Sequence, residues 1–266
     1  MLGFVPAIRK CRFARRFFAR QGADDAACPK ARKEEVTWDG GNIDRKNAFL
    51  LVGMNPKEGS ATRLFITFEG QEGAGKSTQI KLLYEYFLAK GADVILTREP
   101  GGTVVAEKIR EILKDVANDN LSGRAEALLY VAARAQLVDE VIWPHLAGGG
   151  IVLSDRFSDS TIAYQGFGNG RVMEDLACIN AFAVRNLAPD ITFYLRIDAK
   201  AGLARKLTQG APDRIEQKDL SFHMAVKDGY EYLLNKYPRR IIAIDGELPQ
   251  DEIHKIIIKN IESIEN

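Results

Sequence analysis

The sequence predicts an α/β fold in which a parallel sheet of five strands has helices on both faces. Two observations predict this fold. Five short apolar runs rich in β-branched residues alternate with longer stretches whose apolar residues recur at helical spacing. The first apolar run also leads through a glycine-rich loop directly into a helical pattern. Strands that alternate with helices pair in parallel, so both faces of the sheet should be covered.

The expected strands and helices follow one another from residue 64 onward. We expect strands from 64 to a break at Gly70 and at 94–97, 151–154, 191–195 and 241–244, because each run is apolar and bounded by glycine or charged residues. Helical periodicity covers 79–88, 106–116, 124–145, 172–186, 199–207, 216–237 and 249–261. The helix at 124–145 has a broad apolar face, which includes Leu128, Val131 and Val138.

Composition excludes several classes of protein. A chain of 266 residues suits one large α/β domain with a sizeable core. A net charge of +1 argues against a nucleic-acid or membrane-surface partner, and no apolar run approaches the ~20 residues that a spanning helix needs. Cys11, Cys28 and Cys178 lack metal-ligand spacing, and an odd number is a poor disulfide framework. We therefore expect reduced thiols in a cytoplasmic protein.

Residues 1–62 differ from the rest of the chain. Residues 1–53 hold eleven of the 37 Lys and Arg but six of the 36 Asp and Glu, an asymmetry typical of a tail. The basic and aromatic stretch 8–20 permits an organellar presequence or an amphipathic helix on a membrane surface. We favour a third interpretation, in which residues 1–62 are a disordered extension, or the start of the chain is mis-assigned and Met54 is the first native residue. Residues 63–266 form the expected functional domain.

The glycine-rich loop carries a phosphate-binding motif. Residues 70–77 fit G-x-x-x-x-G-K-[ST] with a strand before and a helix after, the context that a P-loop needs. Backbone N–H groups and the helix N-terminus would surround phosphate, Lys76 would reach the β- and γ-phosphates, and Ser77 would ligate Mg²⁺. A chance glycine-rich turn is the alternative, but the lysine, the hydroxyl and the flanking elements all agree. The residues expected to bind ATP are Gly70, Gln71, Glu72, Gly73, Ala74, Gly75, Lys76, Ser77 and Thr78.

Two further charged segments follow strands. Residues 98–102 come after the second strand, and Asp155 and Arg156 come after the third. Ligands of an open parallel sheet gather at the carboxyl ends of its strands, so these segments should meet the P-loop. Asp155 is a candidate Mg²⁺ ligand together with Ser77, and Arg156 suits bidentate recognition of phosphate. A surface ion pair between Asp155 and Arg156 is the alternative.

Five motifs, taken in order, resemble those of the bacterial thymidylate kinases. They are residues 68–78, 97–103, 130–134, 155–166 and 213–216, and the resemblance runs from about residue 63 to the C-terminus. It implies a P-loop NTPase-type fold with a mobile lid, and transfer of the γ-phosphoryl group of ATP to dTMP, giving dTDP and ADP. Because the acceptor is already an anionic phosphate, positioning and charge neutralisation should supply most of the rate.

The resemblance also implies an acceptor site. Tyr130 would lie against the thymine ring, and Arg134, one helical turn on, would hydrogen-bond the base. Tyr164 would pack under the sugar where a ribose 2′-OH would project, and Glu72 would accept a hydrogen bond from the 3′-OH. Without the resemblance, core packing of Tyr130 and a solvated Arg134 would be the ordinary interpretations. The remaining acceptor-site residues implied are Arg98, Glu99, Arg156, Ser160, Thr161 and Gln165.

The lid of the family corresponds to about residues 207–216. The P-loop has no arginine, as in family members whose lid supplies one to the phosphates. Arg214 is the first candidate and Arg205, expected in the ATP site, the second, although this segment is poorer in basic residues than is usual. The implied catalytic residues are thus Lys76, Arg156, Arg214 and Glu72. The family usually forms homodimers through long helices. The apolar face of helix 124–145 could serve as that interface or could pack in the core.

Other functions remain open from the residues alone. A P-loop kinase for dUMP, CMP or a sugar alcohol would share the fold, but Tyr130, Arg134 and Tyr164 favour dTMP. A GTPase-like switch would need an Asn/Thr-Lys-x-Asp motif, and residues 235–238 lack its acid. An imported or membrane-associated protein would depend on the basic N-terminal segment.

Overall fold

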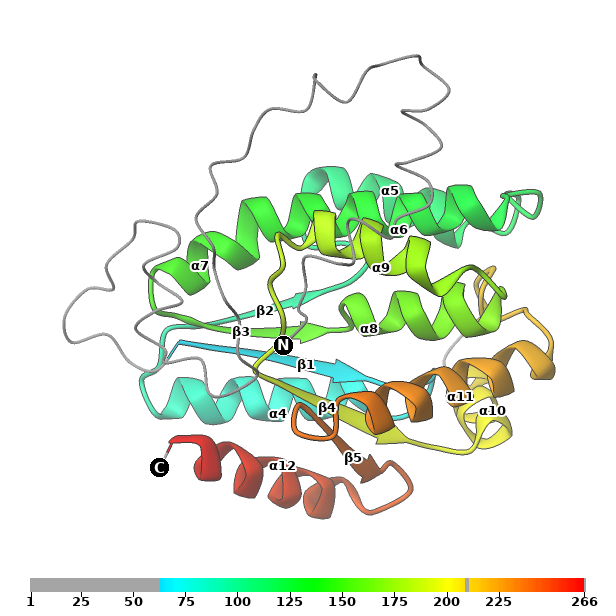
Figure 1. The fold of residues 1–266 in the computed structure, drawn as a ribbon. Helices are drawn as coiled ribbons and strands as arrows, with labels where there is room; N and C mark the ends of the chain where they lie inside the picture. Colours follow the sequence, from blue (N-terminus) through cyan, green and yellow to red (C-terminus); the bar gives the residue numbers. More distant parts are fainter. Residues whose placement is uncertain (1–62, 209–210, 266) are drawn as a thin grey trace, which may run out of the picture.

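The computed structural model describes residues 63–208 and 211–265, and a five-stranded sheet lies at its centre (Figure 1). The strands are β1 (Leu64–Glu69), β2 (Val94–Arg98), β3 (Ile151–Asp155), β4 (Ile191–Arg196) and β5 (Ile241–Asp245). They are ordered β2-β3-β1-β4-β5 and all pair in parallel. The predicted fold class and strands are confirmed. The predictions for residues 1–62 lie outside the described residues.

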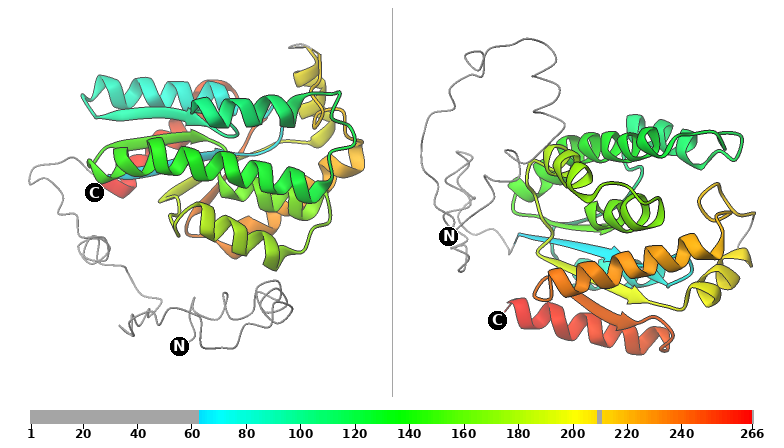
Figure 2. Two further views of the ribbon diagram at one scale, coloured as in Figure 1. Left: turned by 90° about the horizontal axis from the view of Figure 1, so that it is seen from above. Right: turned by 45° about the vertical axis from the view of Figure 1, so that its right-hand side comes forward.

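Helices α4 (Lys76–Ala89) and α12 (Gln250–Glu265) cover one face of the sheet (Figures 1 and 2). Phe68 of β1 packs there in one buried cluster with Leu83 of α4 and Ile257 of α12. The other face of β1 is covered as well, so every residue of this strand is buried. That burial on both faces explains why β1 reads as a continuous apolar run rather than as an alternating one.

On the opposite face, the helix predicted at 124–145 is present but not uniform. It consists of α6 (Gly123–Leu137), the π-helical η2 (Val138–Ile142) and α7 (Trp143–Ala147). Pro144 has no N–H to donate to the preceding turn, which accounts for the departure from α-helical bonding there. Leu137 and Val138 pack on Phe65 and Val152 of the sheet. Helices α5 (Val104–Lys114) and α9 (Met173–Ala183) pack against α6.

Residues 158–168 are helical, which the sequence did not predict. They form α8 (Ser158–Thr161) and the π-helical η3 (Ile162–Gly168). Buried positions of this segment are occupied by polar side chains, among them Asp159, Thr161 and Gln165. A search for apolar periodicity therefore finds no helical signal in it.

Helix α11 (Leu220–Lys236) begins four residues later than predicted. Asp219 caps it by accepting a hydrogen bond from the Phe222 N–H, a strong start signal. Residues 213–216 instead form a turn in which Asp213 accepts from the N–H groups of Ile215 and Glu216. Helix α10 (Ala199–Leu207) lies upstream, and residues 209–210 of the expected lid are outside the described residues.

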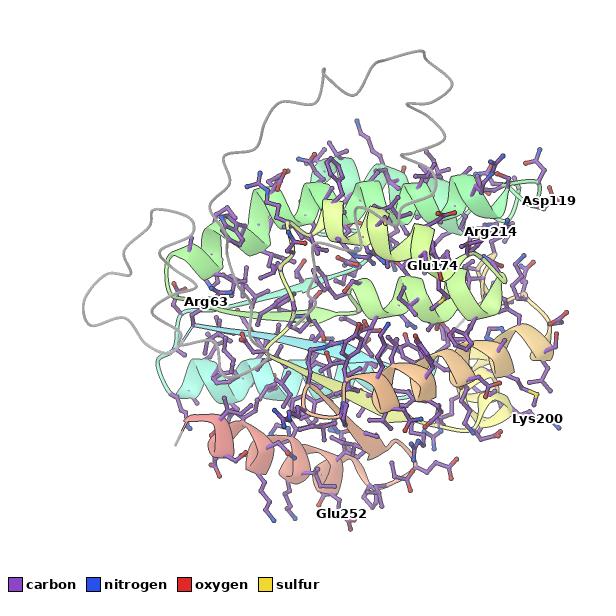
Figure 3. The ribbon with its side chains drawn as sticks, viewed as in Figure 1. Arg63, Asp119, Glu174, Lys200, Arg214 and Glu252 are labelled. Atoms are coloured by element: carbon purple, nitrogen blue, oxygen red, sulfur yellow. The ribbon has the colours of Figure 1, made fainter. Side chains whose placement is uncertain are left out.

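Charged side chains lie mainly at the periphery. Figure 3 shows Asp119, Glu174, Lys200 and Glu252 on the outside of the molecule, whereas Arg214 is buried. Within 63–208 and 211–265, no helix combines the length and the apolar character needed to cross a bilayer.

Candidate active site

The P-loop connects β1 to α4 and lies against β4 and α10. At Gly70, where φ is +130°, a Cβ atom would lie 2.4 Å from the carbonyl oxygen of Leu195. At Gly73, with φ of +71°, it would lie 2.2 Å from the carbonyl oxygen of Gly202 in α10. Only glycine fits both positions, so these two residues allow the loop to pass between the strand end and the helix.

Lys76 is the first residue of α4, and its side chain is buried beneath the loop. Its Nζ donates to the carbonyl oxygen of Gln71 at 2.7 Å, which closes the loop on itself. Burial, followed by repulsion from Arg156, lowers the pKa of Lys76 to about 8. An anion bound between these two cations would relieve that repulsion.

Ser77 and Asp155 meet at the same end of the sheet. The Ser77 hydroxyl donates to Oδ2 of Asp155 at 2.9 Å, so residues predicted to share a magnesium ion lie together. A hydroxyl and a carboxylate oxygen are ligands that Mg²⁺ accepts. Among the described residues, no group of three His, Cys, Asp or Glu side chains could hold a metal. Further ligands would therefore come from water and substrate phosphates, as is usual for Mg²⁺.

Glu72, Arg156 and Tyr164 form one hydrogen-bonded group, here called the acceptor cluster. Arg156 adopts a left-handed backbone with φ of +74°, and its Nη2 donates to Oε1 of Glu72 at 2.9 Å. The Tyr164 hydroxyl reaches Oε1 and Oε2 of Glu72 at 2.7 and 2.9 Å. Burial raises the pKa of Glu72, but Arg156 and Lys76 outweigh it and hold the value below its usual range. Glu72 is therefore an ionised carboxylate between two cations.

Glu69 supports this group and was not predicted as a site residue. Its Oε1 accepts from the Phe157 N–H at 2.8 Å, and its Oε2 accepts from Ser160 Oγ and Tyr230 OH at 2.6 and 2.8 Å. Burial, with a contribution from Asp159, raises the pKa of Glu69 to about 7. The feature of the sequence that could have identified Glu69 is an acidic residue at the end of a fully buried strand, directly before the P-loop.

Arg134 on α6 is 1% exposed, and each of its three guanidinium nitrogens has a partner inside the protein. Nε and Nη2 bind Oε2 of Glu99, and Nη2 also donates to the carbonyl oxygen of Phe157. Nη1 donates to Thr161 Oγ1 at 2.8 Å and to Asn180 Oδ1 at 2.5 Å. The predicted residues Glu99, Arg134 and Thr161 thus come together, with Asn180 of α9 as a member that sequence reasoning missed. Oε1 of Glu99 and Nδ2 of Asn180 are buried with no partner in the described part of the chain.

Other predicted residues lie elsewhere. Arg98 is exposed and pairs with Glu107 through Nη2 at 2.9 Å. Arg205 on α10 donates to the carbonyl oxygen of Gly246 at 3.2 Å, close to the P-loop at Gly73. Arg214 is buried and pairs with Glu126 of α6 at 2.8 Å. The phosphate-binding roles assigned to these three arginines remain predictions.

The remaining predicted residues bind to or lie on the helices that surround the site. Gln71 donates through Nε2 to the carbonyl oxygen of His223 in α11 at 2.7 Å. Gln165 in η3 donates to Oε1 of Glu126 at 3.0 Å. Tyr130 lies one turn after Glu126 on α6, and burial together with the charges of Glu126 and Asp213 raises the pKa of its hydroxyl.

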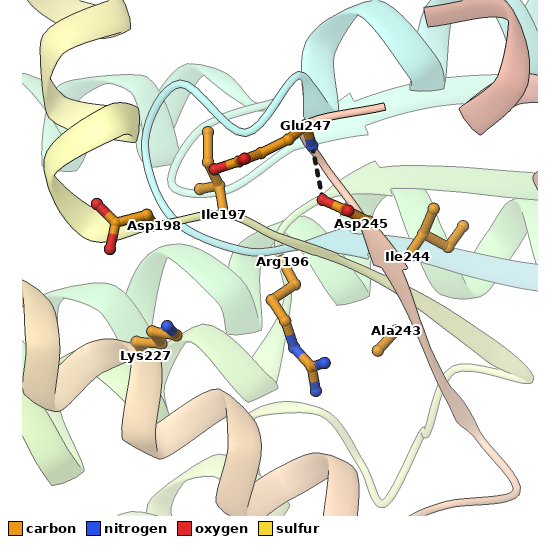
Figure 4. Close-up of a pocket in the computed structure, with 8 residues that line it drawn as sticks. All are labelled: Arg196, Ile197, Asp198, Lys227, Ala243, Ile244, Asp245 and Glu247. Atoms are coloured by element: carbon orange, nitrogen blue, oxygen red, sulfur yellow. Dashed lines mark hydrogen bonds between the residues drawn. The ribbon is translucent and has the colours of Figure 1, made fainter. Parts of the chain in front are cut away.

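A cavity of about 270 Å³ opens at the carboxyl ends of β4 and β5 (Figure 4). None of the predicted site residues lines it. Figure 4 shows Arg196, Lys227 and Asp198 around it, with the Glu247 N–H donating to Asp245. Arg196 is already paired with Glu231 at 2.7 Å. The candidate site is therefore the group around the P-loop rather than this cavity.

Comparisons with known proteins agree on one family. The family model described as "Thymidylate kinase" matches residues 68–257. A thymidylate kinase from Roseiflexus sp. is 49% identical over 195 residues, covering 69% of this chain and 86% of that protein. One from Dehalococcoides mccartyi is 44% identical over 201 residues, covering 76% of this chain and 97% of that protein. The crystal structure of thymidylate kinase from Ehrlichia chaffeensis superimposes with a TM-score of 0.63 at 33% identity, covering 76% of this chain and all of that one.

Proposed function

Because this chain belongs to the thymidylate kinase family, we propose that it transfers the γ-phosphoryl group of ATP to dTMP, giving dTDP and ADP. The observation that best supports the proposal is that Lys76 and Arg156 lie near each other at the carboxyl end of the sheet. Arg156 lowers the pKa of Lys76, and both lie near Glu72. Two converging cations supported by a glycine loop suit two phosphates that must approach each other.

The reaction needs positioning and charge compensation more than proton transfer. An oxygen of the dTMP phosphate attacks the γ-phosphorus, the bond to the β–γ bridging oxygen breaks, and ADP leaves with that electron pair. Lys76 would stabilise charge on the β- and γ-phosphates, and Arg156 would hold the acceptor phosphate. Ser77 and Asp155 would hold Mg²⁺, which when bound neutralises part of the charge of the triphosphate.

The acceptor cluster supports recognition of a deoxyribose. Glu72 is ionised and so can accept a hydrogen bond from a sugar hydroxyl. Its contacts with Tyr164 fix the position of the tyrosine ring, which lies 5.0 Å from the Arg156 guanidinium. At the sugar site, this ring would leave a 2′-OH without a partner, and an unpaired buried hydroxyl disfavours the ribonucleotide.

Base recognition is assigned to the group around Arg134. Thr161 Oγ1 already accepts a hydrogen bond from Arg134, so its hydroxyl would take part in base recognition as a donor, to a carbonyl oxygen of a pyrimidine. The buried Nδ2 of Asn180 and Oε1 of Glu99 lack partners among the described residues and supply a further donor and acceptor. Tyr130 on the same helix would cover the ring. A direct bond from Arg134 to the base would require exchange of one of its present partners.

We further propose a cytoplasmic homodimer. Helices α6 and α9 pack on one another and expose apolar side chains, with Leu128 56% and Phe182 87% exposed. An isolated exposed leucine is ordinary, but a phenylalanine with this exposure, on a helix packed against another that also exposes an apolar residue, suits an interface.

The proposed function is tested by coupled measurement of ADP formation by the full chain with ATP. The acceptors dTMP, dUMP, dCMP, dAMP, dGMP and UMP are supplied separately, and omission of Mg²⁺ is the control. We expect strong preference for dTMP and no turnover without the metal. Preference for another nucleotide would overturn the base-site assignment, and ATP binding without transfer to any acceptor would overturn the proposed reaction.

A further inference from the structure

Arg214 and Glu126 form a buried ion pair that joins the segment before α11 to the helix that carries Tyr130. Nη1 of Arg214 lies 2.8 Å from Oε2 of Glu126, and their side chains are 6% and 2% exposed. Figure 3 labels Arg214 at the same end of the molecule as Asp119. A buried pair of this kind is costly to form unless its geometry is good, and costly to break from one side only.

The same segment also docks on the C-terminal end of α5. Nε of Arg214 donates to the carbonyl oxygen of Leu113 at 2.9 Å, and Lys114 pairs with Asp213 at 2.7 Å. The last carbonyl groups of a helix lack partners within it and favour positive charge. Arg214 therefore binds two neighbouring helices at once.

The second oxygen of Glu126 binds a third element. Its Oε1 accepts from Gln165 at 3.0 Å and from Asn169, which follows η3, at 2.8 Å. Gln165 is adjacent to Tyr164 of the acceptor cluster, and Tyr130 lies one turn along α6 from Glu126. One carboxylate thus connects α6, η3 and the segment containing Arg214.

We propose that Glu126 is a positioning residue for the nucleotide acceptor, and that Arg214 docks on it to set the distance between Tyr130 and Tyr164. This inference rests on the proposed function and refines it. It assigns Arg214 to docking through Glu126 rather than to neutralisation of the γ-phosphate. One nitrogen of Arg214, Nη2, is buried without a partner among the described residues, so direct contact with a ligand is the competing interpretation.

A double-mutant cycle separates the two interpretations. Glu126→Gln, Arg214→Gln and the double variant are compared with the unmodified chain in kcat, KM for dTMP and KM for ATP. We expect each single change to raise KM for dTMP about tenfold, with kcat and KM for ATP within about twofold, because binding is lost equally in the ground and transition states. The double variant should resemble the single variants, since both remove one connection.

Two further variants keep the test decisive. Glu231→Gln breaks the partly exposed pair with Arg196 and should leave KM for dTMP unchanged. Asp213→Asn weakens the peripheral contact with Lys114 and should raise KM for dTMP by about two- to threefold even if Glu126→Gln fails to fold, as checked by thermal unfolding.

Three results would overturn the inference. A large fall in kcat for Arg214→Gln alone would assign Arg214 to the phosphates. Multiplicative effects in the double variant would make the two residues independent. Unchanged KM for dTMP in all variants would make the pair merely structural. Absence of dTMP turnover in the unmodified chain would instead overturn the proposed function, so the two failures are distinguishable.

Discussion

Arginines of the same chemistry have different surroundings in this protein, and the surroundings decide what each can do. Arg98 is exposed and paired with Glu107, and such pairs contribute little to stability. Arg134 is fully buried, and all three of its guanidinium nitrogens are bound by protein groups. Arg156 lies between them in exposure, with one side on Glu72 and the other on Tyr230 and Ser160. Of these three arginines, Arg156 has the contact pattern that best suits exchange with a substrate phosphate.

Lys76→Ala tests the phosphate-binding loop. We expect kcat to fall by about two to three orders of magnitude, because a preorganised positive charge is lost where charge develops. Steady-state kinetics and circular dichroism are the measurements, and the spectrum should be unchanged. Lys81→Ala, on the exposed side of the same helix, is the matched control and should retain activity. Near-normal turnover of Lys76→Ala would exclude the assigned role.

Tyr164→Ala tests discrimination between deoxyribose and ribose. Removal of the ring should open space for a 2′-OH and reduce the preference for dTMP over its ribonucleotide analogue by about tenfold. The ratio of the two kcat/KM values measures this preference. Tyr164→Phe retains the ring and should keep most of the discrimination while losing the bond to Glu72. If both variants discriminate like the unmodified chain, Tyr164 does not contact the sugar.

Glu69 gives the stability a dependence on pH. Its pKa rises from 4.5 to about 7 on folding, so the folded state binds the proton more tightly than the unfolded chain. Its contribution is fully present below about pH 4.5 and is lost as pH rises through 7. The unmodified chain should lose about 2 to 3 kcal/mol of unfolding free energy between pH 5 and 8 that the Glu69→Gln variant does not lose. Urea titrations at several pH values measure this difference, and parallel profiles would contradict it.

At the scale of elements, the sequence predicted the strands and helices that have an apolar pattern. It missed a helical segment whose buried positions hold polar side chains. All five strands were found because each is a short, continuous apolar run between charged or glycine residues. The helical segment 158–168 was missed because Asp159 and Gln165 occupy buried positions, where they bind Arg240 and Glu126. The early start predicted for α11 reflects the helix-like composition of 216–219, which the Asp219 cap overrides.

Close packing of α11 on η3 helps to hold Tyr164 in place, in addition to its hydrogen bonds with Glu72. Gly229 lies where a Cβ atom would come within 2.8 Å of the Ala163 Cα atom and 3.1 Å of Phe167 Cβ. Tyr164 follows Ala163 directly, and its ring lies edge-on to Tyr230 of α11. A side chain at residue 229 would therefore displace the acceptor cluster.

Gly229→Ala measures the cost of that contact. In an exposed helix the change would stabilise by about 1 kcal/mol. Here the clash with backbone should dominate and lower the free energy of unfolding by about 1 to 3 kcal/mol, with a raised KM for dTMP. Asp228→Ala, at the neighbouring exposed position, should leave both quantities nearly unchanged. A stabilised Gly229→Ala variant would show that η3 and α11 have room to separate.

For the whole molecule, the motifs were sufficient to predict the fold and the family, but they did not supply the network beneath the site. Lys76, Ser77, Asp155 and Arg156 could be predicted as site residues because the roles proposed for them depend on spacing from glycines and strand ends. Glu69, Glu126 and Asn180 were missed because their roles depend on which distant side chains they meet. Glu126, for example, binds residues 39 and 43 positions away, together with Arg214.

Phe182→Asp tests assembly of two copies. If the exposed apolar side chains of α6 and α9 form a dimer interface, a buried charge there should shift the protein to a monomer at micromolar concentration. Light scattering coupled to size-exclusion chromatography gives the mass. Leu88→Asp, on α4 across the sheet and 49% exposed, should leave the mass unchanged. A Phe182→Asp protein with the mass of the unmodified chain would exclude this interface.

The strand order also limits when the site can form during synthesis. Strand β1 emerges first but lies between β3 and β4, so its backbone finds no sheet partner until residues 151–155 and then 191–196 have been made. Pairing of strands so far apart in the sequence costs loop-closure entropy before the stabilising contacts between them form. The P-loop therefore leaves the ribosome attached to an unpaired apolar strand. ATP binding in a nascent chain should begin only after β4 has emerged, long after the motif that binds it has been translated.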